Sequence, residues 1–242
     1  MTLLAVEHLD ACHGLLQAVR EVSLEVSAGG TLALVGANGA GKTTLLRAIA
    51  GAHRPAAGRI VFEGADITGV PAYRRAGMGI ALVPEGRHLF SELTVEENLL
   101  VARSSRRRGP WTVDSVVQAF PMLGPLRKKR ARTLSGGEQQ ATAIGRALMT
   151  NPKLLLLDEV SLGLAPVAVE AVYRCLRTLI EGGATILLVE QDLARAMNVA
   201  SRIACMLEGR IVLEGDAGEL TREQVTEAYF GLRRAGGNGG SA

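Results

Sequence analysis

Gly36-Ala-Asn-Gly-Ala-Gly41-Lys42-Thr43 is the stretch of this 242-residue sequence that decides its fold. It follows the short apolar run Thr31–Val35 and opens the segment Lys42–Ala50 (KTTLLRAIA), whose apolar residues have helical spacing. The pattern G-x-x-x-x-G-K-[ST] between a strand and a helix is typical of a loop that wraps a polyphosphate. The ordinary alternative is a glycine-rich turn that caps a helix.

Each residue type in this loop has a physical reason. Glycines let the backbone curve so that several N–H groups point inward, and the helix N-terminus adds partial positive charge. Lys42 would reach the β- and γ-phosphates of ATP, and the Thr43 hydroxyl would bind Mg²⁺. The candidate nucleotide-binding residues are Gly36, Ala37, Asn38, Gly39, Ala40, Gly41, Lys42, Thr43 and Thr44.

A second motif follows in the run LLLLDE, residues 154–159. An apolar strand of this kind places Asp158 at its carboxyl end, where open α/β sheets bind ligands. Asp158 would hold Mg²⁺, and Glu159 would polarise the attacking water. Alone, such a run can simply be a strand that ends at solvent; downstream of a phosphate loop it indicates a hydrolytic site.

Composition sets broader limits. Hydrophobic residues make up 48% of the chain and charged residues 21%, as in globular proteins that need no disulfides or metals to build a core. The widely spaced Cys12, Cys175 and Cys205 suggest neither a disulfide framework nor a metal site, and they favour a reducing compartment. A net charge of +3 is too mild to indicate a nucleic-acid partner.

Basic residues nevertheless form two clusters, one at Arg103 with residues 106–108 and one at residues 126–132 (LRKKRAR). The ordinary interpretation is a solvent-exposed face. The more specific interpretation is a surface that lies near a membrane or binds an acidic partner. The first residues, MTLLAVEHLDACHG, contain no basic segment, so no signal peptide is expected. No apolar run approaches the roughly 20 residues that would cross a bilayer.

The order of elements predicts an α/β fold with a mostly parallel sheet covered on both faces. Strands are expected at residues 3–9, 19–26, 31–35, 59–63, 80–83, 154–157, 185–189, 203–207 and 211–214, the last two forming a hairpin that turns at Gly209. Helices are expected at residues 42–50, 95–103, 113–120, 136–149, 167–180 and 193–200. We expect one domain, residues 1–234, with a helical insert across about residues 86–150, and a flexible tail, residues 235–242 (AGGNGGSA).

The segment Leu134-Ser-Gly-Gly-Glu-Gln-Gln140 narrows the class. It is similar to the signature sequence of ABC ATPases and lies between the two phosphate motifs, as in that family. The resemblance covers about residues 3–232 and implies the P-loop ABC fold, with an antiparallel β subdomain at the N-terminus. It also implies a head-to-tail dimer in which Ser135, Gly136 and Gly137 bind the ATP held by the opposite subunit. Serine and N–H groups at a helix start suit an anion.

Within the family, the chain resembles the ATPase subunits of branched-chain amino acid importers, the LivF type. The segments that carry this likeness are VPEGRHLF (83–90), LTVEENLLV (93–101), AIGRALM (143–149), SLGLAP (161–166), VEQD (189–192) and EAYFG (227–231). The ATPases of urea and short-amide importers are similar, so the solute stays open.

Several positions depart from the general ABC pattern. Glu85 replaces the usual Gln and can still bind metal, while Gln191 replaces the usual His near the γ-phosphate and can still donate a hydrogen bond. Both resemble the LivF type, as does Ala165 in place of Asp. His13 stands where an aromatic residue usually stacks on adenine. Val160 and Ser91 replace prolines, which removes no chemical group.

The resemblance implies an ATP-hydrolysing subunit of an importer, bound to the cytoplasmic face of the cell membrane. Its expected partners are two membrane permease subunits, a second ATPase of the LivG type and, indirectly, a solute-binding protein. Residues 85–98 would grip a permease helix through Leu89, Phe90 and Leu93, unless these three only pack in the core. A soluble ABC ATPase acting on DNA or ribosomes is the alternative from another class, as is a P-loop kinase or GTPase.

Overall fold

The runs expected to be strands form two sheets in the computed structural model, which describes residues 1–14, 16–105 and 107–232. The larger sheet has the order β10-β9-β3-β8-β7-β6. Its strands are β3 Thr31–Val35, β6 Ile80–Val83, β7 Leu154–Asp158, β8 Ile186–Glu190, β9 Arg202–Leu207 and β10 Arg210–Asp216. All its pairings are parallel except that of β9 with β10. The expected tail, residues 235–242, lies outside the described residues.

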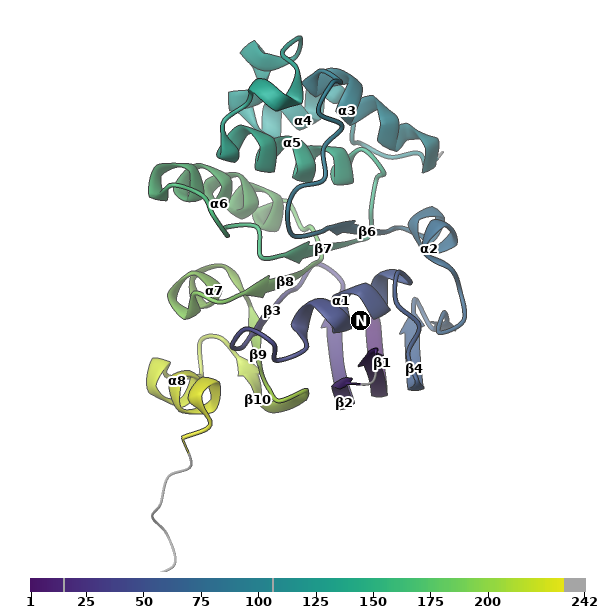
Figure 1. The fold of residues 1–242 in the computed structure, drawn as a ribbon, viewed down its shortest axis with the longest axis vertical. Helices are drawn as coiled ribbons and strands as arrows, with labels where there is room; N and C mark the ends of the chain where they lie inside the picture. Colours follow the sequence, from purple (N-terminus) through teal and green to yellow (C-terminus); the bar gives the residue numbers. More distant parts are fainter. Residues whose placement is uncertain (15, 106, 233–242) are drawn as a thin grey trace, which may run out of the picture.

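The smaller sheet is antiparallel and has the order β2-β1-β4-β5. Its strands are β1 Thr2–His13, β2 Leu16–Ser27, β4 Ala57–Phe62 and β5 Ala65–Asp66. Helix α1, Lys42–Ala50, lies between the two sheets and buries its apolar face against both, for example with Leu45 and Ile49 (Figure 1). The start of α1 is thereby fixed at the carboxyl end of β3.

The opposite face of the larger sheet carries three helices, α6 Pro166–Glu181, α7 Leu193–Val199 and α8 Arg222–Phe230 (Figure 1). Helix α6 belongs to the same apolar cluster as β7 and β8, whereas α7 and α8 pack with β3 and β9. Both faces of the parallel strands are therefore buried, as their continuous apolar runs predict. Within those described ranges, no helix has both the length and the hydropathy of a bilayer span.

All regular elements described between β6 and β7 are helical, and they gather at one end of the molecule (Figure 1). They are α3 Val95–Val101, η1 Ala102–Ser105, α4 Val113–Ala119, η2 Pro121–Leu126, η3 Ala131–Thr133 and α5 Gly136–Leu148. Thr94, Thr112 and Ser135 each begin a helix with a reciprocal capping box. The boundaries proposed for the helical insert and for the single domain stay predictions.

The α/β class with a mostly parallel sheet and an antiparallel N-terminal sheet is confirmed, as is the hairpin that turns at Gly209. Two helices were not predicted, α2 (Ala72–Met78) and α8. Helix α2 depends on Arg75, which is only 1% exposed. Its guanidinium donates to the Ala48 and Ile49 carbonyls at 2.7 and 2.8 Å and so satisfies the end of α1.

Candidate functional site

The phosphate loop is a tight turn that only glycine can make at two points. Gly41 has φ +102°, and a Cβ there would lie 2.0 Å from the Ala18 carbonyl oxygen. Gly36 passes equally close to Met206, whose carbonyl oxygen would be 2.2 Å from such a Cβ. Helix α1 begins directly after this turn, at Lys42. The loop therefore turns N–H groups and the positive end of a helix toward one point, which suits a polyphosphate.

Lys42 is buried in this loop, with 4% of its surface exposed. Its ammonium donates to the carbonyl oxygens of Gly36 and Ala37 at 2.7 and 2.9 Å. The Nζ atom also lies 3.6 Å from Oε1 of Glu159. Burial lowers the pKa of Lys42, and the nearby Glu159 carboxylate opposes that shift. The loop thus holds a dehydrated cation where a phosphate would bind.

Asp158 ends β7 beside this cation, as the position of LLLLDE predicts. The Thr43 hydroxyl donates to Asp158 Oδ1 at 3.1 Å. Burial raises the pKa of Asp158 to about 6; the Thr43 hydrogen bond opposes the rise, and the carboxylates of Glu159 and Glu85 add to it. A buried carboxylate next to a hydroxyl fits a divalent cation, which would take oxygens of both groups as ligands. Among the described residues, no group of three or more His, Cys, Asp and Glu side chains could hold a metal. Water or phosphate oxygens would complete the shell of a cation bound to Asp158 and Thr43.

Glu159 lies one residue beyond the strand, in the left-handed region with φ +47°. Its N–H donates to the Val189 carbonyl at 3.1 Å, which ties it to the neighbouring strand β8. The Gln191 amide donates to Glu159 Oε2 at 2.5 Å, and Lys42 faces the other carboxylate oxygen. Lys42, Glu159 and Gln191 therefore form one connected group of charged and polar side chains.

Two residues that the sequence did not single out support this group. Glu190 is buried at the end of β8, and the Tyr173 hydroxyl on α6 donates to its Oε1. Its Oε2 accepts the Gln191 N–H at 3.1 Å. The Tyr173–Glu190 pair thereby fixes the backbone that presents Gln191. Glu190 stands inside the segment VEQD, but nothing in the sequence paired it with Tyr173.

A cavity of about 420 Å³ opens beside these side chains. Glu85 lines it, which places the third proposed acidic residue at the site, and His13 lines it together with Leu16. Its full lining is His13, Leu16, Ala18, Asn38, Gly39, Gly41, Lys42, Thr43, Thr44, Glu85, Glu159, Leu162 and Gln191. Gly36, Ala37 and Ala40 shape the loop behind this surface, since Ala40 is buried and the other two accept bonds from Lys42.

The signature segment is not part of this cavity. Ser135 caps α5, and its side chain accepts from the Glu138 N–H at 3.4 Å. Gly137 is buried against α6, where a Cβ would lie 2.7 Å from the Cβ of Ala168. One chain thus carries the phosphate loop and the signature at separate places.

Of the two departures from proline, the one at Val160 has a structural explanation. Val160 is 1% exposed and belongs to the apolar cluster formed with α5 and α6. Ser91 is exposed, and its carbonyl accepts the Arg132 N–H at 3.1 Å. Val160 therefore contributes buried area that compensates for a less restricted backbone.

The fold, the phosphate loop and the paired acids define a P-loop ATPase of the ABC class. Residues 19–161, more than half of the chain, match the family model described as ABC transporter. The chain therefore belongs to the ABC transporter family of ATP-binding proteins, and it binds ATP.

The relatives extend this match along nearly the whole chain. The chain is 44% identical to the high-affinity branched-chain amino acid transport ATP-binding protein BraG of Pseudomonas aeruginosa, over 95% of this chain and 100% of the relative. It is 35% identical to a probable branched-chain amino acid transport ATP-binding protein, LivF, of Archaeoglobus fulgidus, over 90% of this chain and 94% of the relative.

A solved structure of similar fold is a nucleotide-free ATP-binding cassette from an ABC transporter. It superposes with a TM-score of 0.79 at 30% identity and covers 94% of this chain and 95% of that one. The likeness to the LivF type and the ABC ATPase fold are thereby confirmed. The P-loop kinase and GTPase alternatives are excluded.

Proposed function

We propose that the chain is the ATP-hydrolysing subunit of an importer of branched-chain or related hydrophobic amino acids. The observation that carries the proposal is the similarity to BraG, which spans 95% of this chain and 100% of that protein. A urea or short-amide importer is the second candidate for the solute. A subunit of this kind would bind to the cytoplasmic face of the membrane without entering it.

The polar and charged side chains at the phosphate loop and the two acids have the following roles in this proposal. Lys42 and the loop N–H groups hold the β- and γ-phosphates, while Thr43, Asp158 and Glu85 hold Mg²⁺, directly or through water. Glu159 accepts a proton from the attacking water, and the Gln191 amide orients its carboxylate. His13, which lines the cavity, would stack on the adenine ring. Bound ATP supplies the phosphoanhydride bond whose cleavage releases the energy for transport.

The separation of signature and cavity supports a head-to-tail dimer as the working unit. Ser135, Gly136 and Gly137 would complete the site of a second subunit, and that subunit's signature would complete this one. The second ATPase in the proposal is of the LivG type. Two permease subunits and an extracytoplasmic solute-binding protein make up the rest of the importer.

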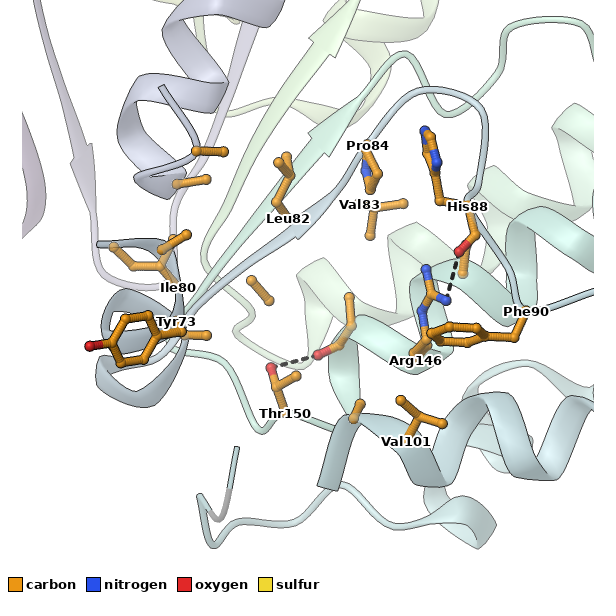
Figure 2. A pocket seen from close by; sticks show the side chains of 18 residues that line it. Tyr73, Ile80, Leu82, Val83, Pro84, His88, Phe90, Val101, Arg146 and Thr150 are labelled. Atoms are coloured by element: carbon orange, nitrogen blue, oxygen red, sulfur yellow. Dashed lines mark hydrogen bonds between the residues drawn. The ribbon is translucent and has the colours of Figure 1, made fainter. Parts of the chain in front are cut away.

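A second cavity, of about 700 Å³, supports a permease contact (Figure 2). Phe90 lines it and is 52% exposed, and Arg146 lies over the Phe90 ring at 5.7 Å. The buried Asn98 fixes the Phe90 backbone from both sides, accepting its N–H at 2.9 Å and donating to its carbonyl at 3.0 Å. An exposed aromatic ring on a rigid backbone is suited to bind an apolar helix.

Of the three apolar residues proposed for this contact, Phe90 alone lines the cavity. Leu89 packs against the apolar core cluster instead, which fits the alternative of ordinary core packing. The other lining side chains come mainly from α2, β6 and α5, including Tyr73, Val83 and Ala143. We refer to this cavity as the helix groove.

Replacing Phe90 tests the helix groove. Phe90→Asp should reduce the permeases that co-purify with the tagged chain by about tenfold or more, because an interface aromatic is lost to a charge. Val212→Asp is the matched control, since Val212 is 47% exposed on β10, outside the groove. ATP binding by both variants should equal that of the unmodified chain. Equal permease recovery with both variants would refute the groove as the contact.

A further inference from the structure

The two basic clusters of the sequence differ in the ion pairs that their arginines make. In the cluster at residues 126–132, Arg127 pairs with Asp114, and Arg130 and Arg132 lie 3.3 and 3.6 Å from Glu92. Those three arginines therefore pair with two carboxylates on the same surface. In the other cluster, Arg103, Arg107 and Arg108 have no carboxylate within 4.0 Å in the part of the chain that the structure describes.

These three arginines line one cavity of about 330 Å³. Trp111, Met149 and Asn151 also line it, so its wall is part apolar and part polar. Like charges repel, so three guanidinium groups without a carboxylate partner around one hollow favour the binding of an anion. We refer to this cavity as the arginine pocket.

Asn151 holds the backbone at Arg107 and Trp111. Asn151 is buried with φ +52°, and its side-chain oxygen accepts the Trp111 N–H at 2.8 Å. Its amide donates to the carbonyls of Arg107 and Trp111, both at 3.4 Å. Gly109 passes so close that a Cβ would lie 2.4 Å from the Asn151 oxygen. The wall of the pocket at Arg107 and Trp111 is therefore ordered before any ligand arrives.

Arg107 stabilises the wall of the pocket. Its Nε donates to the Asn151 carbonyl at 3.0 Å and its Nη1 to the Gly77 carbonyl at 3.1 Å. Arg103 and Arg108 are exposed and make no ion pair with a described carboxylate. Arg107 thus braces the wall, and the other two guanidinium groups are left to bind a ligand.

We propose that the arginine pocket binds a phosphate group, carried by a soluble phosphate ester or by the headgroup of an acidic lipid. Guanidinium forks match phosphate oxygens in pairs, and two such forks beside a third suit a dianion. The volume is at the lower end for ligand pockets, which fits a phosphate with a small substituent. Nucleotide binding at the phosphate loop uses none of these residues.

The position of the pocket bears on the source of the phosphate. Val101 and Ala102 line the helix groove, and the next residue, Arg103, lines the arginine pocket. Likewise, Thr150 lines the helix groove, and the next residue, Asn151, lines the arginine pocket. A permease helix in the groove would bring the pocket toward the membrane, which favours a lipid headgroup as the source of the phosphate. The lipid source rests on the proposed function, whereas phosphate binding does not.

Trp111 supplies the probe, since it is the only tryptophan of the chain and lines the pocket. Inorganic phosphate is titrated into the full chain with the nucleotide cavity saturated by ADP, and Trp111 fluorescence is followed. We expect a saturable change that Arg103→Ala combined with Arg108→Ala weakens by about tenfold or more. Lys128→Ala with Lys129→Ala is the control, because it removes the same charge from exposed positions elsewhere. No saturable change, or equal binding by both double variants, would overturn the proposal.

Vesicles then separate the two sources. Flotation with vesicles of acidic phospholipid, but not of neutral phospholipid, would identify a headgroup if the arginine double variant fails to float. Phosphate binding without flotation would identify a soluble ester. Flotation that is equal for both double variants would show general charge attraction and remove the lipid assignment. Since the importer proposal is tested separately by co-purification of permeases, a failure of phosphate binding is distinct from a failure of that proposal.

Discussion

The ammonium of Lys42 and the carboxylate of Glu159 face each other across the phosphate loop, with Nζ 3.6 Å from Oε1. They lie 117 positions apart by number, 159 minus 42, and meet because β3 and β7 both flank β8 in the parallel sheet. A phosphate that enters the cavity competes with Glu159 for the ammonium. Binding of nucleotide and release of the proposed base are therefore coupled.

Glu159→Gln should change ATP hydrolysis and ATP binding in different directions. Turnover should fall by about 100-fold or more, because an amide cannot accept the proton of the attacking water. ATP affinity should be equal or higher, because Lys42 loses a competing anion. Steady-state hydrolysis and equilibrium ATP binding measure the two quantities. Glu170→Gln, at an exposed position on α6, is the control. Ordinary turnover by Glu159→Gln would remove Glu159 from the role of base.

Lys42→Ala should weaken ATP binding by about 100-fold, the loss expected for two hydrogen bonds from a charged donor. The fold should survive, because alanine is a good helix former at the start of α1. Isothermal titration of ATP, with circular dichroism as a check on folding, measures both. A folded variant with ordinary ATP affinity would contradict the phosphate assignment.

Gln191→Ala should slow hydrolysis by about tenfold while ATP affinity changes little, because Gln191 contacts Glu159 and not the phosphate loop. Gln191→His should restore part of the rate and add a pH dependence between about 6 and 7, where imidazole titrates. The pH profiles of turnover for the three proteins provide the measurement. A profile of Gln191→His that is parallel to that of the unmodified chain would argue against contact with the reacting groups.

Asp158 should make the stability of the metal-free chain depend on pH. Its pKa is about 6 in the folded chain and about 3.9 when unfolded, so the folded state binds the proton more tightly. The stabilisation is fully present below about pH 3.9 and is lost as the pH rises through about 6. Asp158→Asn should flatten that part of the profile in urea unfolding with a chelator present. An unchanged profile in the variant would refute the assignment to Asp158.

Local patterns in the sequence predicted most of the fold. The strand, glycine loop and helix around Lys42 are close together in the chain, so their periodicity and turn residues suffice. The same holds for α5, where the Ser135 capping box marks the first turn. The hairpin at Gly209 was visible for the same reason.

Contacts between distant segments could not be predicted in this way. Helix α2 is short and depends on the buried Arg75, whose partners belong to α1 and to the preceding loop. The Gln191–Glu159 hydrogen bond depends on the alignment of β7 with β8, which no local pattern encodes. The sequence likewise does not show that Asp114 and Glu92 lie beside the basic cluster at residues 126–132.

Affinity purification of the tagged chain from its native membranes, in mild detergent, tests the importer proposal most directly. We predict that two multi-span permeases and a second ABC ATPase co-purify with it, and that recovery of the permeases falls by about tenfold or more with Phe90→Asp. Recovery of ribosomal or DNA-repair proteins without any membrane subunit would contradict the account, and two copies of this chain without a second ATPase would contradict the heterodimer.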